Sequence, residues 1–146
     1  MKIAIASDHA GIELKKHIVE YVNTLGYKIE DFGPFSTDSV NYPTYGKLVA
    51  QKVANNEFER GILICGSGAG ISMSANKVRG IRCVLCSEPY TAAMSREHND
   101  SNVLAMGARV ISFGLAEMIT KTWLEATFEG GRHAQRLQLL HDIENE

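Results

Sequence analysis

The sequence predicts an α/β protein in which a parallel β-sheet carries helices on both faces. Short apolar runs, typical of buried strands, alternate along the chain with stretches whose apolar residues recur at helical spacing. Such alternation implies βαβ units, because each crossover helix packs back on the sheet. The chain has 146 residues, of which 45% are hydrophobic and 22% charged. We therefore expect one globular domain over residues 1–146, with no linker or repeat.

The individual elements follow from the same two patterns. Five strands are expected from short apolar runs, at residues 2–7, 27–32, 61–65, 81–86, and either 103–106 or 109–111. Six helices are expected from helical spacing, at residues 11–25, 45–55, 71–78, 89–98, 115–128 and 133–143. Residues 33–43 contain Gly33, Pro34 and Pro43 among polar side chains, so a loop is expected there.

Composition and charge exclude several classes of function. The formal net charge is −2, and the sequence has no long basic run of the kind that binds nucleic acid. No stretch approaches the ~18 apolar residues that cross a bilayer, and Met1 leads into the first strand without a signal-peptide pattern. The odd count of three cysteines does not suggest a disulfide framework. We expect a cytoplasmic protein that binds neither nucleic acid nor membrane.

A glycine-rich segment follows the third expected strand and opens a helix; it consists of Gly66, Ser67, Gly68, Ala69 and Gly70. Glycines let a ligand approach the backbone, and the N–H groups at a helix start bind anions, so a phosphate or a developing oxyanion would suit this turn. No Gly-Lys-Ser/Thr follows, which excludes a P-loop, and Ile71 replaces the third glycine of a dinucleotide fingerprint. The alternative is a tight turn without a ligand.

Cys65 ends the third expected strand, directly before the glycines. A helix start favours the thiolate, so Cys65 could serve as a base or nucleophile, although a buried core thiol is the commoner fate of a free cysteine. Cys83 and Cys86 lie inside an expected strand, and we interpret them as core thiols.

Polar residues at the ends of other elements are further candidates. Asp8 and His9 directly follow the first strand, where parallel sheets bind ligands, but Asp8 could also simply cap the next helix. His98 could act as an acid or base and Asn99 as an amide donor, or both could belong to a solvated helix end. Arg109, beside Gly107, is an isolated candidate.

A basic cluster lies near the C-terminus. Arg132 and Arg136 are four residues apart and share a helix face, with His133 beside them and two glycines before them. Two guanidinium groups at a helix start suit a phosphate, whereas the alternative is a solvated basic face. The five histidines show no H-x-x-x-H or H-E-x-x-H pair, so the sequence gives little support for a metal site.

Taken together, these segments resemble the type B ribose-5-phosphate isomerases, within the wider family that includes the galactose-6-phosphate isomerase subunits. The resemblance runs through almost the whole chain, in the segments SDHAG (7–11), NYP (41–43), GILICGSGAGISMSANK (61–77), GIR (80–82), SREHND (95–100) and EGGRH (129–133) with Arg136. It implies a Rossmann-like three-layer α/β/α sandwich with a five-stranded parallel sheet. It also implies a homodimer with active sites between subunits, a tetramer being left open, and a sugar phosphate as the bound small molecule.

The resemblance further implies interconversion of D-ribose 5-phosphate and D-ribulose 5-phosphate through an enediol(ate), with no metal and no other cofactor. By similarity, Cys65 would be the base and His98 the acid that opens the sugar ring. Asp8 and His9 would contact the sugar, and the Gly66–Gly70 backbone with Asn99 would hold the enediolate oxygens. The phosphate would be bound by Arg109, Arg132 and Arg136, with His133 nearby.

Three alternatives remain at this point. The first is a hexose 6-phosphate of the allose or galactose type as substrate, because pocket size is not visible in the sequence; Ser67, where many relatives carry threonine, does not decide this, since both residues supply a hydroxyl. The other two lie outside the isomerases: a nucleotide-binding module and a non-catalytic phospho-sugar sensor. Cys65 and His98 argue against a sensor, which needs no base.

Overall fold

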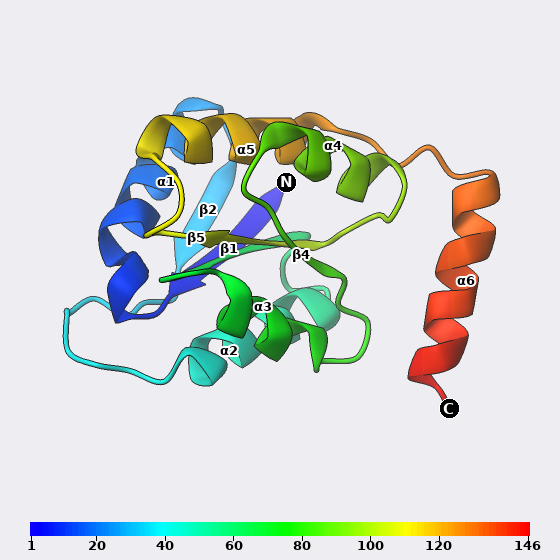
Figure 1. Ribbon diagram of the computed structural model, residues 1–146, viewed down its shortest axis with the longest axis horizontal. Helices are drawn as coiled ribbons and strands as arrows, with labels where there is room; N and C mark the ends of the chain where they lie inside the picture. Colours follow the sequence, from blue (N-terminus) through cyan, green and yellow to red (C-terminus); the bar gives the residue numbers. More distant parts are fainter.

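The computed structural model describes residues 1–146 and contains five strands, six α-helices and one short 3-10 helix (Figure 1). The strands are β1 (Lys2–Ser7), β2 (Lys28–Asp31), β3 (Arg60–Cys65), β4 (Cys83–Leu85) and β5 (Val103–Gly107). The helices are η1 (His9–Gly11), α1 (Ile12–Thr24), α2 (Tyr42–Ala54), α3 (Ala69–Asn76), α4 (Pro89–Glu97), α5 (Phe113–Glu125) and α6 (Arg132–Glu144). No helix is long and apolar enough to cross a membrane.

All strands are parallel and form one sheet in the order β2-β1-β3-β5-β4, which confirms the predicted five-stranded parallel sheet. The chain adds β2 on one side of β1 and then crosses to place β3 on the other side. The carboxyl ends of β1 and β3 therefore flank the point where the strand order reverses, which is where open α/β sheets bind ligands.

Two helical layers cover the sheet, as Figure 1 shows. Alternate side chains of β1 explain how: Ile3 and Ile5 pack with α1, α4 and α5, while Ala4 and Ala6 pack with α2 and α3. The central strands are buried on both faces, so they consist of nearly continuous apolar residues.

The structure changes several expected boundaries. The fifth strand is at residues 103–107, so the alternative at 109–111 was wrong. The loop after β2 ends at residue 41 rather than 43, because Pro43 lies in the first turn of α2, where its missing N–H is not needed. Helix α3 begins two residues earlier than expected, because Gly68 adopts a left-handed conformation (φ 81°) and turns the chain directly into the helix.

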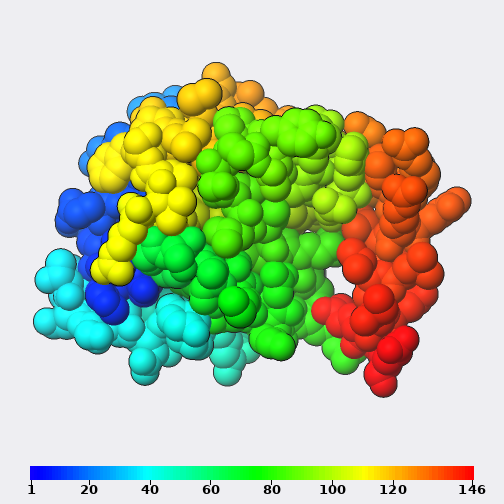
Figure 2. All heavy atoms as spheres, in the orientation of Figure 1, coloured from blue at the N-terminus to red at the C-terminus, as the bar shows by residue number.

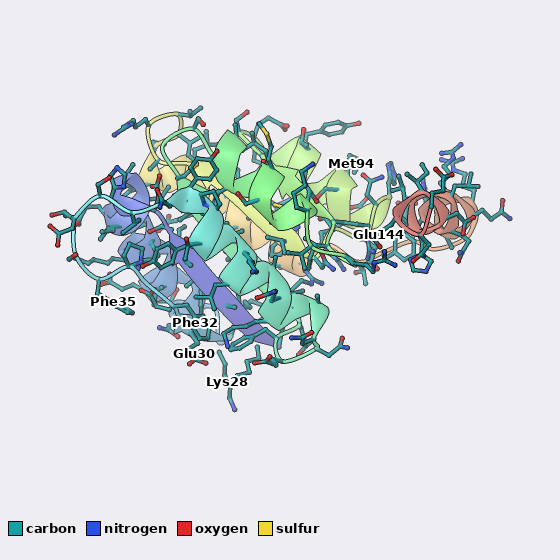
Figure 3. All side chains as sticks on the ribbon, turned by 90° about the horizontal axis from the view of Figure 1, so that it is seen from below. Lys28, Glu30, Phe32, Phe35, Met94 and Glu144 are labelled. Atoms are coloured by element: carbon teal, nitrogen blue, oxygen red, sulfur yellow. The ribbon has the colours of Figure 1, made fainter.

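Helix α6 stands apart from the three layers. Figure 1 shows it on the side of the molecule opposite α1, and Figure 2 shows a hollow between it and the neighbouring surface. Few contacts hold it there; one is the bond that the Gly80 N–H donates to Glu144, on the side of α6 facing the molecule (Figure 3). His133 is its only buried residue.

Candidate active site

The thiol of Cys65 lies at the carboxyl end of β3 and is almost fully buried. Its Sγ accepts a hydrogen bond from the backbone N–H of Gly68, at 3.1 Å. This N–H belongs to the turn that starts α3, so the sulfur lies beside the N-terminal end of that helix. The sulfur therefore faces a backbone donor at the start of α3.

A pocket of about 390 Å³ opens beside this thiol, at the point where the strand order reverses. Six of the predicted site residues line it, from three different loops, together with two residues that the sequence did not indicate: Asp8, Cys65, Gly66, Ser67, Gly70, Arg109, Tyr42 and Val110. We name this set, with His9, Gly68 and Ala69 from the same loops, the thiol half-site. The structure thereby brings together residues that are about one hundred positions apart.

Backbone hydrogen bonds fix the three loops to one another. The Asp8 N–H donates to the Ile64 carbonyl, and the N–H groups of Ala108 and Arg109 donate to the carbonyls of Cys65 and Gly66. Because these bonds join loops at the ends of neighbouring strands, the thiol half-site is as rigid as the sheet that carries it.

Asp8 and His9 each have a defined partner. Asp8 is buried, and its Oδ1 accepts the Ala10 N–H at 2.9 Å, so it caps η1 as well as lining the pocket. The Nδ1 of His9 accepts the Val40 N–H at 3.2 Å. An Nδ1 that accepts leaves Nε2 as the protonated nitrogen of the neutral ring, so His9 has a donor to offer a sugar hydroxyl.

Space is short at three glycines of the half-site, most severely at Gly68 and Gly70. A Cβ at Gly68 would lie 2.8 Å from the Met106 carbonyl carbon, and one at Gly66 would lie 3.1 Å from the Arg109 guanidinium. A Cβ at Gly70 would lie 2.8 Å from the ring of Tyr42. The missing side chains therefore let Arg109 and Tyr42 reach the edge of the pocket.

Sequence reasoning missed Tyr42 because it begins a helix far along the chain from Cys65 and belongs to no local motif of its own. The only available signal was the segment NYP at 41–43, in which Pro43 indicates a helix start.

The remaining predicted residues form a second group, which we name the clamp half-site: His98, Asn99, Arg132, His133 and Arg136. The imidazole rings of His98 and His133 are stacked, with centroids 4.2 Å apart and planes 11° from parallel. Glu129 faces both rings, 3.4 Å from Nε2 of His133 and 4.0 Å from Nε2 of His98. His98 thus stacks on the buried ring of His133, which lies in the first turn of α6.

Arg132 and Arg136 lie on the first turns of α6 and are exposed. Two exposed guanidinium groups beside the start of a helix are free to bind a phosphate. None of the five clamp residues lines the pocket of the thiol half-site. Asn99 instead lines the separate hollow under α6, so the two half-sites do not meet within one chain.

His98, Glu129 and His133 could in principle hold a metal ion, since their ligand atoms lie within 4.8 Å of one another. The nitrogen lone pairs, however, lie in the two ring planes, and those planes are nearly parallel. A single ion cannot lie in both planes unless a ring rotates. The arrangement fits a stacked pair better than a preformed metal centre.

Cys83 and Cys86 belong to neither half-site, and their thiols are not reactive. Burial raises the pKa of each thiol to about 12, so both stay protonated at neutral pH. Such thiols are poor bases and poor nucleophiles.

Comparisons with known proteins identify the family of the chain. The family profile described as Ribose/Galactose Isomerase matches residues 3–140. The chain is 51% identical to Ribose-5-phosphate isomerase B of Escherichia coli, over 98% of this chain and 96% of that protein.

Solved structures agree as well. Ribose-5-Phosphate Isomerase B of Clostridium thermocellum superposes with a TM-score of 0.98 at 51% identity, covering 99% and 98% of the two chains. Ribose-5-phosphate Isomerase B of Mycoplasma genitalium, solved with bound ribulose-5-phosphate, superposes with a TM-score of 0.95 at 41% identity, covering 99% and 97%. The chain belongs to the ribose/galactose isomerase family.

Proposed function

We propose that this protein interconverts D-ribose 5-phosphate and D-ribulose 5-phosphate, with Cys65 as the base and His98 as the acid that opens the sugar ring. The observation that carries the proposal is the Cys65 thiol, hydrogen-bonded to the Gly68 N–H inside a pocket that also holds Asp8 and Arg109. Support comes from relatives of nearly the same length that are named ribose-5-phosphate isomerase B.

The chemistry needs one proton to move between two neighbouring carbons. The Cys65 thiolate takes the proton from C2 of the open-chain aldose, and the electrons of that bond form the C1–C2 double bond of an enediol(ate). The electrons of the C1 carbonyl move onto O1, which takes up the proton that O2 releases. The thiol then returns its proton to C1 as the C1–C2 double bond is lost and O2 forms the C2 carbonyl of the ketose. One base on one face of the substrate performs both proton transfers at carbon.

Negative charge develops on O1 of the substrate during the first step. In the first turn of α3, the Ala69 N–H donates to the Ser67 hydroxyl and the Ser72 N–H to the Gly68 carbonyl, whereas the N–H groups of Gly70 and Ile71 have no partner in the chain and can donate to this oxygen. Preorganised donors of this kind contribute about 3–4 kcal/mol each to transition-state stabilisation. Asn99 can supply a further donor from the clamp half-site.

Ribose 5-phosphate exists mainly as a furanose ring, which must open before C2 can be deprotonated. In this step His98 gives a proton to the ring oxygen as the C1–O bond breaks, and the C1 hydroxyl loses a proton, with Asp8 as its acceptor. Arg132, Arg136 and Arg109 would bind the phosphate, and His133 would support His98. Binding energy at the remote phosphate fixes the position of the reacting carbons.

We further propose that a homodimer assembles the active site, with the thiol half-site of one subunit facing the clamp half-site of the other. Helix α6 supports this proposal, because it exposes Leu139, Leu140 and Ile143 although it buries only His133. Three large apolar side chains on a helix with few contacts to its own chain are suited to packing on a second copy.

The experiment that tests the reaction compares the wild type with Cys65→Ala, using ribose 5-phosphate after treatment with EDTA. We expect the wild type to keep its activity and the variant to lose about 10³-fold in kcat, since one base is worth about 10²–10⁴-fold. The KM should change little, because the phosphate contacts remain.

The outcome also separates the alternatives. Binding of ribose 5-phosphate without turnover would indicate a sugar-phosphate sensor. Turnover of allose 6-phosphate or galactose 6-phosphate, but not of ribose 5-phosphate, would indicate a hexose enzyme of the same family. A Cys65→Ala variant with wild-type kcat would mean that the base is another residue.

A further inference from the structure

The turn that follows α4 carries His98 and Asn99, and it is held by groups that the proposed reaction does not use. Asp100, the next residue, adopts a left-handed backbone conformation with φ 46°. This conformation costs an L-residue about 1–2 kcal/mol and persists only where the surroundings enforce it. The groups that enforce it are two arginines.

The first of these is Arg82, which directly precedes β4. Its Nε donates to the carbonyl oxygens of Asn99 and Asp100, both at 3.1 Å. Its Nη2 donates to the same Asp100 carbonyl at 2.9 Å and to the Asp100 carboxylate at 3.2 Å. One guanidinium therefore grips two successive peptide groups and a side chain of the turn.

The second is Arg96, which is buried in the last turn of α4. Its Nη1 donates to the other oxygen of the Asp100 carboxylate at 2.8 Å and also to the Ser101 carbonyl. Asp100 is thus fixed between two arginines, one on each carboxylate oxygen. The planar fork of a guanidinium is suited to such multiple contacts in a way that a lysine is not.

Arg82 is itself anchored to the sheet. Its N–H donates to the side chain of Asn102 at 2.8 Å, and its carbonyl accepts the Asn102 N–H at 3.0 Å. The position of the turn is therefore set by the register of β4 on β5.

We propose that Arg82 is a positioning residue of the active site: together with Asp100 it orients the turn that presents His98 and Asn99 to the substrate. The inference rests on the proposed function, in which these two residues act on the sugar. Stacking on His133 holds the ring of His98 from one side, and the arginine grip fixes the backbone that carries it.

The test is Arg82→Gln and Arg82→Lys, with Ser95→Ala as the matched control. Ser95 is buried beside the same turn and bonds to Ser101 and Ala92, but its side chain makes no hydrogen bond with residue 99 or 100. Both Arg82 variants should lower kcat about 10–100-fold, since small misplacements of catalytic groups have effects of this size. Lysine should not rescue the activity, and the control should lose stability without losing kcat.

The position of the His98 ring can also be followed by NMR, without measuring the reaction. In ¹H–¹³C spectra of histidine-labelled protein, assigned with His98→Asn, the His98 ring signals should shift in both Arg82 variants and remain unchanged in Ser95→Ala. The limb of the kcat/KM pH profile that disappears in His98→Asn should also move in the Arg82 variants. The moderately buried Arg82 is chosen because Asp100→Asn would leave Arg96 buried without its partner and could unfold the protein.

The inference is wrong if Arg82→Gln keeps wild-type kcat, pH profile and His98 signals, whatever its stability. It is also wrong if lysine restores them fully, because charge alone would then suffice. Failure of the proposed function has a different signature: His98→Asn would keep full activity on ribose 5-phosphate, while the His98 signals would still report on the arginine grip.

Discussion

The two half-sites are built in different ways, although both belong to one proposed active site. The thiol half-site lies at the ends of buried central strands, where backbone hydrogen bonds join its loops. The clamp half-site lies on the end of α4 and the start of α6, a helix whose only buried residue is His133. Backbone bonds at the strand ends hold the first, whereas the second is linked to the sheet through the side chain of Arg82 and, in our proposal, also depends on another subunit.

This difference suggests a division of labour. The base and the oxyanion donors must be placed within a fraction of an ångström, and the sheet provides that precision. Phosphate binding tolerates more freedom, because long arginine side chains can adjust to a tetrahedral anion. His98, the acid in our proposal, and Asn99, the further donor, are the exceptions in the clamp half-site; His98 stacks on His133, and Arg82 bonds to the backbone of the turn that carries both.

The largest effect is expected when half-sites from different subunits are combined. Cys65→Ala and His98→Asn should each be nearly inactive alone. Exchange of subunits between them should restore about a quarter of wild-type activity, since half of the dimers are mixed and each has one intact site. Activity of the refolded mixture, with heterodimers counted by native mass spectrometry, checks this prediction.

The matched control is a mixture of Cys65→Ala with Asp8→Asn, both in the thiol half-site. No mixed dimer of this pair contains an intact site, so no activity should return. Recovery in the control, or none in the first mixture despite verified heterodimers, would show that the half-sites are not paired across subunits in the proposed way.

A smaller effect should separate binding from chemistry. Replacing Arg132 by Ala removes charge-assisted hydrogen bonds worth about 1.5–3 kcal/mol, so KM for ribose 5-phosphate should rise about 10–100-fold with a smaller change in kcat. Steady-state kinetics measures both constants, and Gln135→Ala, at an exposed position of the same helix, is the control. A fall in kcat at unchanged KM would move Arg132 from phosphate binding to catalysis.

Much of the fold could be predicted from the sequence because strands and helices alternate in clear apolar patterns. The fifth strand was ambiguous, since two short apolar runs follow each other, and only pairing with β3 decides between them. The thiol half-site was largely predictable, because its residues follow strand ends in local motifs. Tyr42 was not, because it meets Gly70 only through the packing of α2 on α3.

The clamp half-site shows where sequence reasoning stops. Its residues were indicated by local motifs, but the stack of His98 on His133 depends on how α6 docks, which no local pattern encodes. No local pattern indicates the role that we propose for Arg82 either. Its segment, GIR at 80–82, belongs to the family resemblance, but its hydrogen bonds to Asn99 and Asp100 join positions 17 and 18 residues apart.

The smallest expected effects compare Gly68 of the thiol half-site with Gly130, which lies two residues before Arg132 of the clamp half-site. Gly68 combines a left-handed backbone with a Cβ position 2.8 Å from the backbone of Met106, whereas Gly130 is left-handed (φ 69°) but has nothing within 4 Å. Gly68→Ala should therefore lower the free energy of unfolding by at least about 2 kcal/mol, and Gly130→Ala by about 1 kcal/mol. Urea denaturation with intrinsic Trp123 fluorescence measures both. Equal losses would mean that the clamp half-site is packed as tightly as the thiol half-site, and the contrast between them would have to be abandoned.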